Sequence, residues 1–149
     1  MASGNYSTTN PQASNPSFAK PDSSVALGAI ETLVSQISDP VLCVDGHGQI
    51  MLANDAAVTL FGYERAAFVG SPVDQLIPIA SRHKHQAHLQ RYMASPRQRT
   101  MSHRMELYAQ RSDGTTFPVE VSLSPLVYND QQCVMAFIVD IWQRQRREA

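Results

Sequence analysis

The sequence is poor in cysteine, in net charge and in long apolar runs, and each shortage excludes a class of protein. Its two cysteines, Cys43 and Cys133, make neither a disulfide framework nor a CxxC metal motif. A net charge of -1 provides no general attraction to nucleic acid or to anionic membranes. The longest apolar run, Cys133–Val139, is far shorter than the ~20 residues of a membrane-spanning helix. These shortages predict reduced, buried thiols in a cytoplasmic protein.

The composition that remains is typical of one globular domain with a polar tail. Of the 149 residues, 43% are hydrophobic and 17% are charged, which suffices for one core. Residues 1–22 are rich in Ser, Asn, Thr and Pro, so we expect a disordered leader there. No charged segment followed by an apolar one occurs at the N-terminus, and we expect no signal peptide. The expected domain covers 23–142, and 143–149 begins an outgoing helix.

Periodicity and turn residues predict the order of elements in this domain. The expected elements are a helix at 24–36, strands at 41–44 and 49–53, helices through Phe61, at 64–69 and at 80–94, and strands at 104–111, 117–126 and 132–141. Asn54 or Asp55 is expected to cap the helix through Phe61, Gly62 to end it, and Phe117, Val119, Val121 and Leu123 to share one strand face. Two hairpins around a helical insertion indicate an α+β fold with one five-stranded antiparallel sheet, helices packed on one face and flanking terminal helices. The natural cavity of such a fold lies between sheet and helices.

The segment Arg82–Met93 is the most informative part of the chain, because it places three of the five histidines on one expected helix. Side chains three, four and seven positions apart share a helix face, so His85 lies near the centre of a stripe with His88, Leu89 and Tyr92. An inward imidazole needs a partner, since an unpaired buried polar group is costly. That partner is a hydrogen bond, a ligand or a metal, and the residues alone leave all three open.

Other chemistries are less well supported by the residues. His83, His85 and His88 suggest a transition-metal site, but only the last two share a face and no carboxylate joins them. Arginines near this helix suit an anionic ligand, although a solvated basic face explains most of them. We find no phosphate-binding glycine loop, no Gly-x-Ser-x-Gly motif and no carboxylate pair in a pocket-like context, so we do not expect an enzyme.

A series of short motifs, in order and at consistent spacing, resembles the PAS sensor family over Val25 to Trp142. The motifs are Ile37-Ser38-Asp39-Pro40, Asp45-Gly46-His47-Gly48, Ala53-Asn54-Asp55-Ala56-Ala57, Leu60-Phe61-Gly62-Tyr63, Arg111-Ser112-Asp113-Gly114-Thr115 and Val139-Asp140-Ile141. The resemblance implies the PAS fold, with a signalling helix that leaves after the last strand and carries the message to an effector.

Within that family the chain is most similar to the haem-binding PAS domains of bacterial oxygen and redox sensors, such as the rhizobial oxygen-sensor histidine kinases. In these sensors a helix histidine binds the haem iron, and the resemblance places His85 at that position, with Arg91 and Tyr92 also matching. The same alignment puts His103 where some members have a distal methionine. Met105 stands where an arginine steadies bound oxygen, a departure that weakens the case for oxygen itself.

The strand pattern agrees in part with a haem site. His103, Met105 and Leu107 alternate onto one strand face, which would bring His103 toward the cavity that His85 enters. Two imidazoles are a sensible axial pair for haem iron. The expected site therefore holds haem b, with His85 and His103 as metal ligands and with pocket residues Leu89, Arg91, Tyr92, Met105 and Leu107. Bis-histidine ligation would suit a redox sensor or a carbon monoxide or nitric oxide sensor.

The resemblance implies a regulatory module of bacterial signal transduction. We expect a homodimer formed through Val25–Ile37 and the outgoing helix, coupled to an effector such as a two-component histidine kinase or a cyclic-di-GMP enzyme. A cofactor-free interaction module and a PAS domain with another small ligand are the alternatives. Flavin fits less well, because Leu76-Ile77-Pro78 replaces the Asn-Cys-Arg-Phe-Leu motif of photosensing PAS domains. Neither nucleic acid nor a membrane span is expected.

Overall fold

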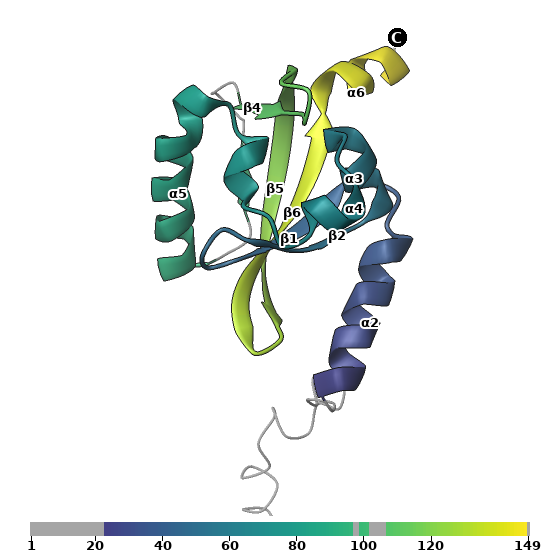
Figure 1. Cartoon of the computed structure of the whole chain (residues 1–149), viewed down its shortest axis with the longest axis vertical. Helices are drawn as coiled ribbons and strands as arrows, with labels where there is room; N and C mark the ends of the chain where they lie inside the picture. Colours follow the sequence, from purple (N-terminus) through teal and green to yellow (C-terminus); the bar gives the residue numbers. More distant parts are fainter. Residues whose placement is uncertain (1–22, 97–98, 102–106, 149) are drawn as a thin grey trace, which may run out of the picture.

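The computed structural model describes residues 23–96, 99–101 and 107–148 of the chain (Figure 1). The expected leader at 1–22, and the expected site residues His103 and Met105, lie outside the described residues. The described part confirms an α+β fold built on one antiparallel sheet. In this part of the chain no helix is long and apolar enough to cross a membrane.

Among the described residues, six strands form the sheet, and two of them, β3 and β4, share one place at its edge, so that five strands lie side by side. Its strands are β1 (Val41–Asp45), β2 (Ile50–Ala53), β3 (Arg99–Met101), β4 (Leu107–Gln110), β5 (Thr116–Tyr128) and β6 (Gln131–Asp140). The order is β2-β1-β6-β5, and both β3 and β4 pair with β5 on its other side. Met101 pairs with Val121 and Leu107 with Val119, so β3 and β4 occupy successive stretches of one edge. Strand β3 was not predicted, because its polar start at Arg99 and Thr100 shows no apolar alternation.

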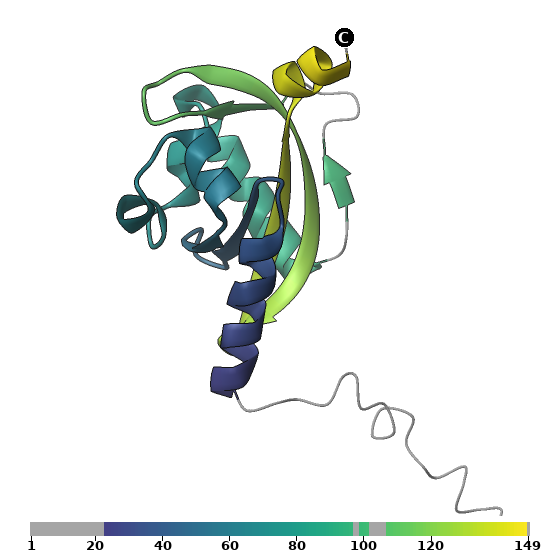
Figure 2. The same ribbon diagram turned by 90° about the vertical axis from the view of Figure 1, so that its right-hand side faces the viewer.

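Helices and short turns of 3₁₀ helix fill the connections. They are α2 (Ser23–Gln36), α3 (Asp55–Phe61), α4 (Arg65–Phe68), η2 (Val73–Leu76), η3 (Ile79–Ser81), α5 (Arg82–Ala94) and α6 (Ile141–Glu148). Helix α3 begins and ends as predicted. The Asn54 side chain accepts a hydrogen bond from the Ala57 amide, and Gly62 closes the helix at φ 76°. Helix α6 begins at Ile141, earlier than expected, and leaves the sheet at the end opposite the β5–β6 turn (Figure 2).

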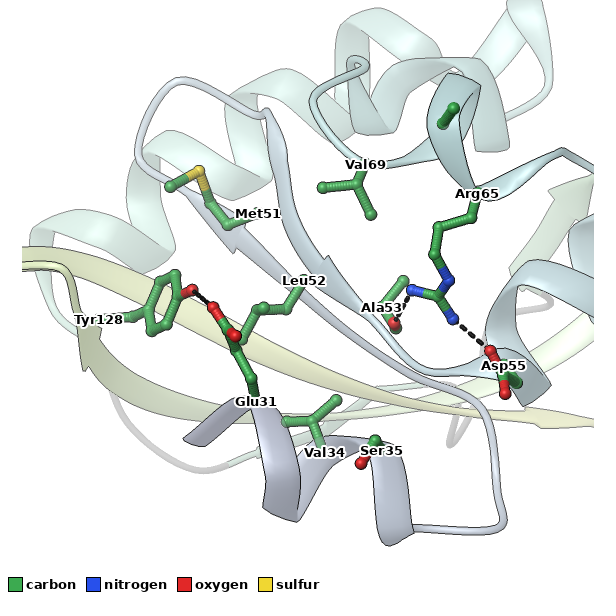
Figure 3. Close-up of a pocket in the computed structure, with 11 residues that line it drawn as sticks. Glu31, Val34, Ser35, Met51, Leu52, Ala53, Asp55, Arg65, Val69 and Tyr128 are labelled. Carbon is green, nitrogen blue, oxygen red and sulfur yellow. Dashed lines mark hydrogen bonds and ion pairs between the residues drawn. The ribbon is translucent and has the colours of Figure 1, made fainter. Parts of the chain in front are cut away.

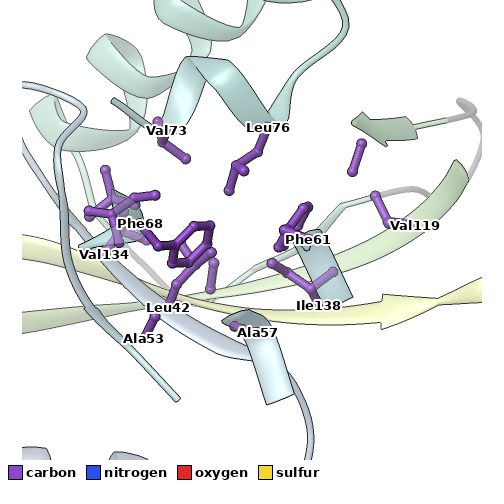
Figure 4. Close-up of a cluster of buried hydrophobic side chains, with 14 of the residues drawn as sticks. Leu42, Ala53, Ala57, Phe61, Phe68, Val73, Leu76, Val119, Val134 and Ile138 are labelled. Carbon is purple, nitrogen blue, oxygen red and sulfur yellow. The ribbon is translucent and has the colours of Figure 1, made fainter. Parts of the chain in front are cut away.

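The main core lies between the sheet and α3, α4, η2 and α5 (Figure 4). The predicted alternation of β5 is confirmed, since Phe117 and Val119 are buried in this core. The Phe61 ring lies 6.0 Å from Phe68 and 5.9 Å from Phe117, measured between ring centroids. Such aromatic contacts contribute more than their buried area alone. This core joins the sheet and the helical layer into one unit.

A smaller buried cluster lies outside the main core. Val34 of α2 is buried, as are Val41, Cys43 and Cys133 of the central strands, and none of these belongs to the main core. Helices α2 and α5 lie on opposite sides of the strands (Figure 1). Both cysteines are free and buried, as predicted. Burial, together with the neighbouring Cys133, raises the pKa of the Cys43 thiol to about 12, which makes it a poor nucleophile.

Candidate functional site

Helix α5 contains His85, the expected haem ligand, and contacts the rest of the domain near its start and near its end. Its sequence contains no glycine, proline or β-branched residue, so helix propensity is favourable throughout. At its start, Arg82 Nε donates a hydrogen bond to the Ile77 carbonyl at 2.8 Å. Further along, Tyr92 is buried in the core and Leu89 packs against it. The helix therefore presents a fixed face to the interior.

The turn between β1 and β2 holds this helical layer in place. Gly48 has a φ of 83°, and a Cβ atom there would lie 3.6 Å from Leu89 Cδ2. Its carbonyl accepts a 2.7 Å hydrogen bond from the Val73 amide at the start of η2. Helix α5 and η2 are thus both held against the same turn. This arrangement brings Asp74 of η2 beside the first turns of α5.

Asp74 is the partner of His85. His85 Nδ1 lies 3.3 Å from Asp74 Oδ1, and Gln86 Nε2 donates to Asp74 Oδ2 at 2.8 Å. The two side chains are 31% and 28% exposed, so the pair lies at the margin of the core. His85 is therefore only partly buried, and Tyr92, at 5% exposed, takes the deepest position of the expected stripe. The carboxylate satisfies the imidazole that the sequence left without an identified partner.

The described site residues fall into two groups. Leu89, Tyr92 and Leu107 join one apolar cluster, although they come from α5 and β4. Arg91 is exposed, as is His83 on the outer side of α5. Among the residues that the structure describes, no group of three or more His, Cys, Asp or Glu side chains is placed to hold a metal ion. The structure thus brings His85 together with the Asp74 carboxylate.

A second polar constellation links the core to the outgoing helix. Arg111 Nε donates to the Leu60 carbonyl at 3.1 Å, and its guanidinium carbon lies 4.0 Å from the centre of the Phe117 ring. Arg111 Nη2 also lies 3.5 Å from Asp140 Oδ2, while Asp140 Oδ1 accepts a hydrogen bond from the Gln143 amide of α6. One arginine therefore contacts the end of α3, the core and the β6–α6 junction. We did not identify this link from the sequence.

The fold and the motifs agree with a known family. A model of the PAS fold family matches residues 28–141. The chain belongs to the PAS family. This PAS domain is a sensory module of signal transduction, as its motifs had indicated.

Two proteins that are similar to this PAS domain are several times longer than it. It is 28% identical over 120 residues to the sensor protein FixL of Bradyrhizobium diazoefficiens, covering 80% of this chain and 24% of FixL. It is also 28% identical over 121 residues to an uncharacterised Azorhizobium caulinodans protein, covering 80% of this chain and 16% of that protein. The chain therefore spans a quarter or less of these relatives' length.

Solved structures share the fold at low sequence identity. The PAS domain of a Colwellia psychrerythraea protein has a TM-score of 0.64 at 19% identity, covering 80% of this chain and 99% of that one. The PAS domain of Bordetella pertussis BvgS has a TM-score of 0.62 at 18% identity, covering 83% and 96%. A Rhodobacter sphaeroides LOV protein has a TM-score of 0.65 at 14% identity, covering 79% and 68%. These likenesses establish the architecture.

Proposed function

We propose that this PAS domain binds haem b through His85 and senses a diatomic gas or a change of redox state. The observation that carries the proposal is the contact between His85 Nδ1 and the Asp74 carboxylate. When Nδ1–H is donated to a carboxylate, Nε2 keeps its lone pair and is the nitrogen able to bind iron. Metal-binding histidines in proteins commonly have such a carboxylate or carbonyl partner.

The neighbouring residues suit the same role. Leu89, Tyr92 and Leu107 supply an apolar wall beside the pair, and Arg91 supplies a cation for a propionate. The resemblance to haem-binding sensors adds His103 as the proposed second ligand and Met105 as a proposed pocket residue. When bound, haem held by His85 and His103 would supply a redox-active iron that also binds carbon monoxide or nitric oxide. Asp74 holds the orientation of the His85 ring throughout.

The proposed output path runs through Arg111. A shift of α3 or of the core would move its guanidinium, and with it the Asp140 carboxylate at the start of α6. Helix α6 would pass that movement to an effector, which we propose to be a histidine kinase or a cyclic-di-GMP enzyme in the cytoplasm. In this scheme the PAS domain acts without catalysis of its own.

An absorption spectrum tests the haem proposal directly. We expect the full chain, reconstituted with haem, to show a Soret band that His85→Ala abolishes and His83→Ala leaves intact. His83 is the matched control because it lies exposed on the same helix. Asp74→Asn should keep the band but weaken haem affinity by about tenfold or more. His103→Ala should convert a low-spin ferric spectrum to high-spin if His103 is the sixth ligand.

A second candidate function is favoured by the packing of the interior. Phe61, Phe68 and Phe117 are almost completely buried and fill the space between sheet and helices. Such a core suits a cofactor-free interaction module. A chain that shows no Soret band after reconstitution, or the same band in His85→Ala, would contradict the haem proposal and favour this module.

We also propose that the domain is a homodimer joined through Val25–Ile37 and α6. Leu33 of α2 is 63% exposed, and it lies on a helix that projects from the domain, where a partner helix would cover it. Sedimentation of the full chain should give a mass that rises toward twice the monomer value with concentration. Leu33→Glu should shift this equilibrium toward monomer, and a monomer mass at every concentration would contradict the proposal.

A further inference from the structure

A cleft of about 600 Å³ lies between α2, β2 and α4 (Figure 3). None of the residues that line it belongs to α5, so the cleft is separate from the His85 site. Val34, Met51, Leu52 and Val69 form its apolar surface. Its volume is within the range of about 300–1,000 Å³ typical of small-molecule sites. The cleft therefore has room and an apolar lining for a ligand.

One end of the cleft carries a positioned cation. Arg65 Nη1 donates to the Ala53 carbonyl at 2.8 Å, which fixes the guanidinium at the cleft's edge. Arg65 Nη2 also pairs with Asp55, whose side chain is 96% exposed. A pair this exposed contributes little free energy, so another carboxylate can replace Asp55 at low cost. The planar guanidinium suits a bidentate contact with such a group.

The other end of the cleft is closed by a protein carboxylate. Tyr128 Oη donates to Glu31 Oε2 at 2.8 Å, joining the end of β5 to α2 (Figure 3). Burial, together with this hydrogen bond, raises the pKa of Tyr128 to about 12, so the phenol remains a donor at neutral pH. A second negative charge on a ligand would be repelled by Glu31. Because Asp55 lines the cleft as well, the charge pattern fits only a ligand whose single anionic group takes the place of Asp55 on Arg65.

We propose that this cleft is a second ligand site, for an apolar molecule with a single carboxylate that pairs with Arg65. The apolar body lies over Met51, Leu52 and Val69, and contacts Val34 of α2. Because α2 forms one wall and α4 the other, the ligand stabilises α2 against the domain. This site is independent of haem at His85.

Methyl NMR spectra of the full chain titrated with sodium octanoate test the site. We expect saturable shifts of the Met51, Val34 and Val69 methyl groups, with octanoate bound about threefold to fivefold more tightly than octan-1-ol. Arg65→Gln should remove that difference, while Arg146→Gln, an exposed arginine on α6, should preserve it. Val69→Glu should weaken octanoate binding through charge repulsion.

Ile79→Glu is the matched control for Val69→Glu, because Ile79 is an exposed apolar residue outside the cleft lining. It should leave octanoate affinity unchanged. Equal affinity for octanoate and octan-1-ol in the unmodified chain would overturn the proposal. So would shifts confined to core methyl groups such as those of Leu76 and Ile138, because these would place the ligand in the interior.

Discussion

Asn54→Ala is expected to lower the free energy of unfolding by about 3–5 kcal/mol. The Asn54 side chain is 2% exposed. Its Oδ1 accepts from the Val41 and Ala57 amides at 3.0 Å. Its Nδ2 donates to the Ile37 and Asp39 carbonyls at 2.8 and 2.7 Å. Removing the amide leaves these backbone groups without that partner, and it detaches α3 from the segment that joins α2 to β1. Urea unfolding followed by circular dichroism measures the change.

Two further variants separate the parts of this effect. Thr59→Ala, at an exposed position of α3, should change stability by less than about 0.5 kcal/mol. Asn54→Asp keeps the two accepted bonds but turns a second carboxylate oxygen toward two carbonyls. It should therefore destabilise the domain almost as much as alanine does. If Asn54→Ala and Thr59→Ala unfold at the same urea concentration, the hydrogen bonds of the Asn54 side chain do not hold α3 to the segment between α2 and β1.

Arg111→Met is expected to destabilise the domain by about 2–4 kcal/mol and to loosen α6. Methionine retains the apolar length of the side chain over Phe117 but leaves Asp140, whose side chain is 5% exposed, without its cation. A buried carboxylate deprived of its partner is costly. The Gln143 amide donates a hydrogen bond to Asp140 Oδ1. In Arg111→Met, hydrogen exchange at this amide should become faster than exchange at core amides, which requires global unfolding.

The control is Arg144→Met, because Arg144 makes a more exposed pair with Glu120 and should lose less than about 1 kcal/mol. The double variant Arg111→Met/Asp140→Asn should be less destabilised than the sum of the single variants, since the two side chains interact. If the losses of unfolding free energy in the two single variants simply add, and exchange at the Gln143 amide is unchanged, Arg111 does not couple the core to α6.

Much of the fold followed from local pattern. The stop at Gly62 and the alternation from Phe117 to Leu123 depend on neighbours within a few positions, so the sequence predicted them correctly. For the cap it left Asn54 and Asp55 as alternatives. Strand β3 was missed because its pairing with β5 decides it. The 3₁₀ turn at Val73–Leu76 was missed too, and with it Asp74, since no periodic signal joins residues on separate elements.

The sequence by itself determined the α+β class, the PAS family, the buried thiols and the presence of His85 on a helix above the core. Periodicity and turn chemistry encode the class, the thiols and the helix, because each side chain's face depends on its own element, whereas the family followed from the resemblance of the ordered motifs. Only the tertiary structure decided that Asp74 meets His85, that Arg111 meets Asp140, and that Glu31 meets Tyr128 across 97 positions to close a cleft. Such contacts depend on how whole elements pack, and spacing along the chain carries no record of that packing.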